Sequence, residues 1–290
     1  MDLLKNSKGE VRNGWKAGGF LLVFVALVAL VNVTTKYLLH VHHVGMLTNV
    51  ALSTAVGLGA AWICLAIEGK PLASMGYRLD ARWGGELGLG VLGGAGIMVL
   101  TALVTLGVGG FHWTRGAGDL TSTGWGLLLF VLVGFNEETL FRGYYFQRAV
   151  DGLGSLGGLL LGGAIFALAH FGNPGMHGAT LFWAAVNIAL AGILLGLCYL
   201  KTRSLALPIG VHIGWNFTQG NLLGFGVSGT TDAKGLLQPV FHGRPEWLTG
   251  GAFGLEASLP CAVVCLAAVI ALALWKGRPV SAGPTTAPAS

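Results

Sequence analysis

Charged residues are scarce in this sequence. Asp, Glu, Lys and Arg make up only 10% of the 290 residues, whereas soluble domains contain about 25%. Hydrophobic residues account for 53%, the mean hydropathy is +0.71, and no polar stretch is long enough to form a soluble domain. This composition excludes a soluble globular enzyme and predicts a polytopic membrane protein.

Cysteine is also scarce. The four cysteines, Cys64, Cys198, Cys261 and Cys265, all lie within apolar runs. Cys261 and Cys265 are spaced i,i+4 and could share a helix face, but free cysteines in apolar segments usually behave as small hydrophobic residues. A cysteine framework for disulfides or metal is therefore not expected.

The sequence lacks an obvious internal repeat, which argues against a transporter built from inverted repeats. The net charge is +5, but the basic residues lie in short loops, where they orient a protein in the membrane. The expected partner is therefore the lipid bilayer and not nucleic acid.

Apolar segments of about 20 residues, the length that crosses a bilayer as a helix, recur along the chain. The first is too long for the core of a signal peptide, so it is interpreted as an uncleaved transmembrane helix. We expect an all-α, polytopic transmembrane helical bundle of about eight spans. The expected spans are residues 17–36, 46–67, 84–108, 124–147, 155–171, 179–200, 205–223 and 257–275.

The distribution of Lys and Arg predicts the orientation of these spans. Basic residues occur in the N-terminal segment, in loops 68–83, 148–154 and 201–204, and after the last span. By the positive-inside rule, these segments and both termini are cytoplasmic in a multi-pass protein of the inner or plasma membrane. The loops on the other side contain few basic residues: Lys36, Arg115, Lys234 and Arg244.

A single integral-membrane domain is predicted for residues 1–280. Residues 281–290 are rich in Ala, Pro, Thr and Ser and are expected to be disordered. The longest connection, residues 224–256, is expected to fold back over the extracytoplasmic mouth of the bundle rather than to form a domain of its own.

The fourth predicted span contains charged residues that are costly inside a membrane, so their default interpretation is functional. Adjacent helical residues point about 100° apart, so Glu137 and Glu138 cannot share a face. Arg142 follows Glu138 at i+4, the spacing of an intrahelical ion pair. Glu137 is then left to face another partner. The alternative is that Arg142 and Arg148 simply neutralise both acids.

Two further apolar spans each place polar side chains at i,i+4. Phe166 and His170 share one face of the fifth span, and His212 and Asn216 share one face of the seventh. The alternative, purely structural interpretation of both pairs is that they make polar contacts between helices.

These residues together suit hydrolysis. A water between Glu137 and His170 could lose a proton to either group, while His212 and Asn216 could donate hydrogen bonds to a developing oxyanion. Alternatively, Glu137, His170 and His212 could bind zinc, a known set of three ligands with one position left for water. The sequence has no HExxH motif, which would have indicated zinc, and the spacing leaves both alternatives open.

The order Glu-Glu-x-x-x-Arg, Phe-x-x-x-His and His-x-x-x-Asn on separate apolar helices resembles the CAAX protease and bacteriocin-processing (CPBP) family of intramembrane proteases. The resemblance covers about residues 122–220. It implies that Glu137 and His170 activate water and that His212 and Asn216 form the oxyanion site. It also implies that Glu138 and Arg142 are structural, and that the mechanism uses either a metal or the glutamate alone.

The expected activity is therefore cleavage of a peptide bond in a membrane-associated substrate, prenylated or not. The alternative is a non-catalytic membrane scaffold or bacteriocin-immunity protein of the same fold. The helix boundaries create one difficulty. Glu137 and His212 fall near mid-membrane or on its cytoplasmic side, whereas His170 falls near the outer end of its span. The chemistry requires these side chains to converge.

Overall fold

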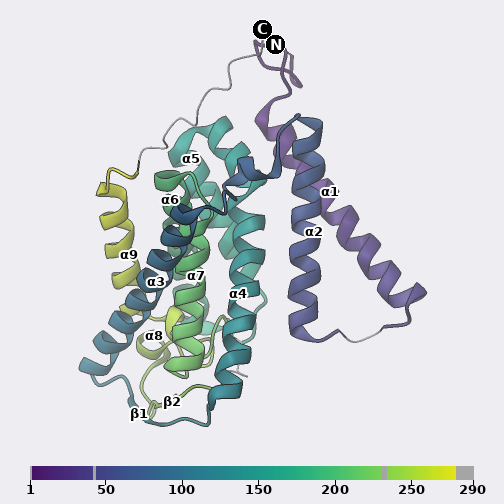
Figure 1. Cartoon of the computed structure of the whole chain (residues 1–290). Helices are drawn as coiled ribbons and strands as arrows, with labels where there is room; N and C mark the ends of the chain where they lie inside the picture. Colours follow the sequence, from purple (N-terminus) through teal and green to yellow (C-terminus); the bar gives the residue numbers. More distant parts are fainter. Residues whose placement is uncertain (1, 42–43, 230–233, 279–290) are drawn as a thin grey trace.

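The computed structural model describes residues 2–41, 44–229 and 234–278, and the expected disordered tail at 281–290 lies outside them. The chain is mostly helical, as predicted. Figure 1 shows α1 beginning and α9 ending at one end of the bundle, here called the terminal end, whereas β1, β2 and α8 lie at the opposite end, here called the strand end. The long helices are α1 (Asn13–Val33), α2 (Met46–Ile67), α3 (Ala81–Gly107), α4 (Leu120–Arg142), α5 (Tyr144–His170), α6 (Gly178–Thr202), α7 (Ala206–Phe217) and α9 (Leu259–Leu274).

Shorter elements complete the fold. Strands β1 (His112–Arg115) and β2 (Leu237–Val240) pair antiparallel, with His112 opposite Val240. Two π-helical turns, Thr34–Leu38 and Thr218–Leu222, extend α1 and α7. The remaining short helices are α8 (Glu246–Thr249) and the 3₁₀ turns Leu72–Met75 and Leu255–Ala257.

Five of the described helices are long and apolar enough to cross a membrane, with Leu120–His170 counted as one. That segment folds back on itself at Gly154, whose φ of 74° suits glycine. Phe146 before the bend packs against Gly162 after it, where an added Cβ would lie 3.0 Å from the Phe146 ring. All eight apolar segments expected to cross are helical, but α9 is shorter than a full span, and the number of spans stays a prediction.

The first turn of α4 is set by a capping box. The Asp119 carboxylate accepts a hydrogen bond from the Ser122 backbone N–H, and the Ser122 hydroxyl accepts one from the Asp119 N–H. The hydrogen bonds from Ser122 lower the pKa of the Asp119 carboxyl. This cap begins the helix that carries Glu137.

A close crossing of α3 and α7 positions the helix that bears His212. Gly90 and Gly94 of α3 face Gly210 and Gly214 of α7, each pair four residues apart. An added Cβ would lie 2.7 Å from the Trp215 backbone N at Gly94, and 2.8 Å from the Val91 carbonyl carbon at Gly214. Small residues let two backbones come this close in lipid, where van der Waals packing drives helix association. These glycines therefore permit the close approach of α3 and α7.

Candidate active site

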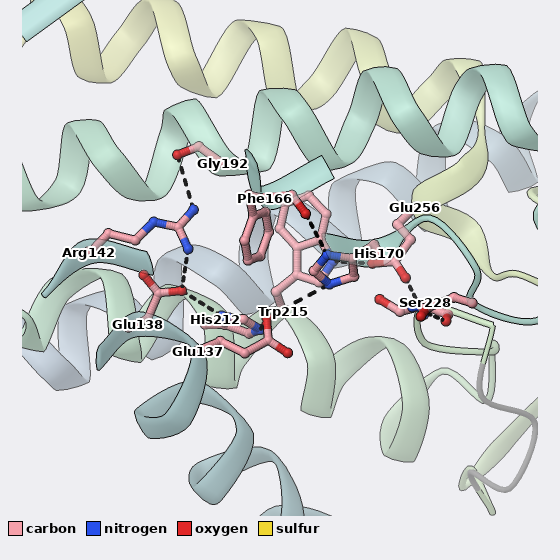
Figure 2. A network of polar contacts seen from close by, with 11 residues as sticks. Glu137, Glu138, Arg142, Phe166, His170, Gly192, His212, Trp215, Ser228 and Glu256 are labelled. Carbon is pink, nitrogen blue, oxygen red and sulfur yellow. Dashed lines mark hydrogen bonds and ion pairs between the residues drawn. The ribbon is translucent and has the colours of Figure 1, made fainter. Parts of the chain in front are cut away.

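A fully buried chain of polar contacts crosses from α4 to α7. Arg142 Nη1 donates to Glu138 Oε1 at 3.0 Å, and the His212 Nδ1–Glu138 Oε1 distance is 2.8 Å. Figure 2 shows Glu138 between the other two side chains. Glu138 and Arg142 are 0% and 1% exposed. The i,i+4 pair is therefore present, and Glu138 also holds His212, a contact that spacing along one helix could not indicate.

The Arg142 guanidinium has two further partners. Its Nη2 donates to the Gly192 carbonyl at 3.1 Å, and its central carbon lies 4.3 Å from the centre of the Phe166 ring. Phe166 belongs to the Phe-x-x-x-His segment of α5. A buried cation needs this many partners because an uncompensated charge in a low-dielectric interior is strongly destabilising. Arg148, in contrast, pairs with Glu68 and Asp151 rather than with the motif acids.

Glu137 faces two histidines. The Nε2 atoms of His170 and His212 each lie 3.8 Å from Glu137 Oε2. The three side chains come from α5, α7 and α4 respectively, and Figure 2 shows them pointing toward one another. The uneven depths in the sequence are reconciled because α5 turns back at Gly154 and ends at His170, beside the middle of the bundle.

The other ring nitrogens establish the tautomers. His170 Nδ1 lies 2.7 Å from the Phe166 carbonyl oxygen, which can only accept, so this nitrogen carries the proton. The Glu138 carboxylate assigns the proton to Nδ1 of His212 in the same way. With the proton on Nδ1, Nε2 of each ring presents a lone pair toward Glu137 when the ring is neutral, and donates a hydrogen bond when the ring is protonated.

Two cavities meet at these residues, and His170, His212 and Asn216 line both. The smaller has a volume of about 40 Å³, room for at least one water. The larger measures about 830 Å³ and reaches Glu137. Asn216 is 7% exposed and lies one helical turn after His212. A peptide in the larger cavity could therefore reach all four predicted catalytic side chains.

The same residues can be tested for zinc. Tetrahedral zinc with bonds of about 2.0–2.1 Å holds its ligand atoms about 3.3–3.4 Å apart, closer than the two 3.8 Å separations seen here. No group of three His, Cys, Asp or Glu side chains within the described residues is placed to hold a metal ion. Two acceptors that share one water at about 2.7–3.0 Å lie about 4.3–4.8 Å apart, so the observed separations fall between the zinc and the water geometries.

Sequence reasoning missed Glu256. This residue lies in the 3₁₀ turn before α9, is 6% exposed, and lines the smaller cavity. One carboxylate oxygen accepts a hydrogen bond from Trp215 Nε1 at 3.4 Å, and the other accepts one from the Ser228 backbone N–H. Burial raises the pKa of the Glu256 carboxyl. The only signal in the sequence is a lone acid just before an apolar run.

Ser228 links this carboxylate to the larger cavity. Its φ of 48° is unusual for a residue other than glycine, and it lines both cavities. Its N–H is held by Glu256, and its carbonyl accepts a hydrogen bond from Asn173 Nδ2 at 2.9 Å. The segment around Ser228 thus forms part of the wall of both cavities.

Comparison with known families now bears on this site. Residues 119–218 match the family model described as type II CAAX prenyl endopeptidase Rce1-like. The match covers about a third of the chain and supports the resemblance to the CAAX protease family over these residues. No curated protein and no solved structure matches the chain. The matched range contains Glu137, Glu138, Arg142, His170, His212 and Asn216.

The family and the apolar helices together describe a multi-pass membrane protein whose relatives are hydrolases of the CAAX protease type. The matched residues begin at the capping box of α4 and end just after α7. They therefore include all three helices that meet at Glu137, whereas Glu256 and most of the strand end lie outside the matched range.

Proposed function

We propose that this chain belongs to the CAAX protease family and is an intramembrane endopeptidase that hydrolyses a peptide bond in a membrane-anchored protein or peptide. One observation carries the proposal: two histidine Nε2 atoms and Glu137 Oε2 converge within 3.8 Å at the end of a cavity large enough for a polypeptide. A scaffold or immunity protein would not need these costly groups unpaired inside the bundle.

In the proposed mechanism a water sits between Glu137 and His170. As the water oxygen bonds to the substrate carbonyl carbon, one of these two groups takes its proton. The carbonyl oxygen becomes an oxyanion, which accepts hydrogen bonds from Asn216 Nδ2 and from Nε2 of protonated His212. The retained proton then passes to the leaving nitrogen as the C–N bond breaks, which releases a carboxylic acid and an amine.

The buried chain behind the site supports this role for His212. Its Nδ1–H donates to Glu138, and a carboxylate at that position stabilises the imidazolium that must donate from Nε2. Arg142 in turn compensates Glu138 and links it to α6 through Gly192. We infer that Glu138 and Arg142 hold the His212 ring in place and stabilise its protonated form, without touching the substrate.

Comparative proteomics of membrane fractions tests the function before any substrate has been identified. Cells that produce Glu137→Gln at wild-type abundance should accumulate an uncleaved membrane protein and lack its cleavage product. Glu10→Gln, at an exposed carboxylate in the N-terminal segment, is the matched control and should give the wild-type pattern. Identical patterns for Glu137→Gln and wild type would refute the proposal.

We also propose that the reaction needs no metal, because Asn216 beside His212 makes a better hydrogen-bond donor pair than a zinc ligand pair. Metal analysis of purified, active protein should find much less than one zinc per chain, and chelators should leave the turnover unchanged. About one zinc per chain together with activity that chelators abolish would overturn this part of the proposal and assign Glu137, His170 and His212 as ligands.

A further inference from the structure

The larger cavity is lined from the strand end of the bundle. Met46, Leu47 and Val50 are in the first turns of α2, and Ser122 and Trp125 are in the first turns of α4. The loop that follows α7 adds Val227, Ser228, Gly229 and Lys234. The cavity thus extends from Glu137 toward the end where β1 and β2 pair.

Toward the terminal end, packed side chains close the cavity. Gly57 of α2 lies against Leu140 of α4, where an added Cβ would be 2.8 Å from a Leu140 methyl group. The rings of Tyr77 and Phe135 stack at 6.5 Å between their centres, and Tyr77 also hydrogen-bonds to Thr139. Helices α2 and α4 therefore touch beyond Glu137 and leave space between them on the strand-end side.

The basic loops identify the two faces of the membrane. Loops 68–83, 148–154 and 201–204 and the residues after α9 connect or follow helices at the terminal end. Together with residues 5–16, these segments contain 12 of the 17 Lys and Arg residues of the chain, so the positive-inside rule makes the terminal end cytoplasmic. The open side of the cavity is then extracytoplasmic.

The walls of the cavity indicate the chemistry of its occupant. One wall is apolar, with Leu47 and Val50 from α2 and Leu129, Phe130 and Val133 from α4. Elsewhere the lining includes two buried amide oxygens, Asn136 Oδ1 and Asn221 Oδ1, that have no hydrogen-bond partner among the described residues. Asn221 is 4% exposed. Amide side chains beside an apolar wall suit a peptide, whose backbone is polar and whose side chains can be apolar.

The size of the cavity indicates an extended peptide. Asn221 packs against Gly126 of α4, where any Cβ would collide with its amide group. Gly126 and Glu137 are separated on α4 by about 16 Å at 1.5 Å per residue. An extended chain rises about 3.3 Å per residue, so about five residues fit between Asn221 and the reacting carbonyl.

From this geometry we propose that the substrate is an extended, apolar, extracytoplasmic segment of a membrane-anchored polypeptide, which enters the site from the strand end. The apolar side chains of the segment lie against α2 and α4, and its backbone passes the amide side chains of Asn136 and Asn221. A tail on the cytoplasmic side has no path to Glu137. That the segment is cleaved rests on the proposed function. The direction from which it enters rests only on the cavity and on the positions of the basic segments.

Cysteine labelling with a charged, membrane-impermeant maleimide tests the direction of access without any cleavage assay. Leu129→Cys places a thiol on the cavity wall. Leu128→Cys is the matched control. Leu128 directly precedes Leu129 on α4, but it is 45% exposed on the bundle surface and would face lipid. Lys70→Cys marks the terminal end. The four native cysteines are buried, so the unmodified chain supplies the background.

In intact cells, Leu129→Cys should react and Lys70→Cys should react only after permeabilisation, while Leu128→Cys should stay at background in both. Reaction of Leu129→Cys only after permeabilisation, or not at all, would overturn the proposal, as would reaction of Lys70→Cys in intact cells. Repeating the assay in Glu137→Gln separates the two claims. Leu129→Cys should still be labelled in this variant, because labelling does not require catalysis. The direction of access can therefore be established even if the protein proves not to be a protease.

Discussion

Glu137 and Glu138 are neighbours on α4 but lie in opposite environments. Glu138 is 0% exposed and is held by Arg142 and His212. Glu137 has a side chain 23% exposed, reaches the large cavity, and leaves one oxygen without a hydrogen-bond partner among the described residues. The comparison teaches that a step of one residue, about 100° around the helix, separates a group that stabilises the fold from a group kept available for chemistry.

The largest effect on stability is expected from Arg142→Ala. This change leaves Glu138 buried without its ion pair, and breaking a buried pair costs about 3–5 kcal/mol. Thermal melting in detergent should show a clear loss of stability together with lost activity. Arg142→Lys keeps the charge but not the fork that reaches both Glu138 and Gly192, so its loss should be smaller. If Arg142→Ala has normal stability but lacks activity, Arg142 acts in catalysis or substrate binding, as proposed for Glu137, and not in stabilising the fold.

The crossing of α3 and α7 should respond next most strongly. Gly94→Ala forces the helices apart because its Cβ would lie 2.7 Å from the Trp215 N, and overpacking typically costs about 1–3 kcal/mol. Gly93→Ala is the matched control, since no atom lies within 4 Å of its added Cβ. Melting temperatures should fall for Gly94→Ala only. Equal melting of the two variants would mean that the close approach does not hold α7 in place.

Glu256→Gln probes the cavity wall around Ser228. Glu256 accepts from Trp215 with one oxygen and from Ser228 with the other, so the amide nitrogen of Gln must face a donor. The loss of one such bond costs about 1–3 kcal/mol, and kcat should fall as the wall moves. Adding Trp215→Phe removes one donor and should partly restore kcat. If the two losses simply add, Glu256 and Trp215 act on kcat independently.

The smallest effect is expected from Asn221→Ala on the open side. Removing one hydrogen bond to the substrate costs about 0.5–1.5 kcal/mol, so KM should rise about two- to twelve-fold with kcat unchanged. That pattern indicates binding lost equally from the ground and transition states. A selective fall in kcat would instead place Asn221 near the reacting atoms.

The sequence could predict the local features of the site. Spacing alone indicates that Glu138 and Arg142 pair, and that Glu137 points elsewhere, because helical periodicity determines both. The helical character of the apolar segments follows from their length and composition. The resemblance to CAAX proteases likewise depends on motifs that can be read along the chain.

Contacts between elements were beyond the sequence. The bond between Glu138 and His212 joins α4 to α7, and the meeting of His170 with Glu137 depends on where α5 turns at Gly154. Glu256 arrives from a loop more than 80 residues after His170, with no periodicity to mark it. Such long-range packing depends on close helix crossings, whose depth a single sequence does not specify.

Turnover and thermal stability of Glu137→Gln beside Glu138→Gln test the central claim most directly. Both variants are measured as purified protein, on a substrate identified from the proteomic comparison. Glu137→Gln should melt like the wild type and lose about 10²–10⁴-fold in kcat, whereas Glu138→Gln should lose stability as well as activity. Wild-type turnover by Glu137→Gln, or equal loss of stability in the two variants, would contradict the account.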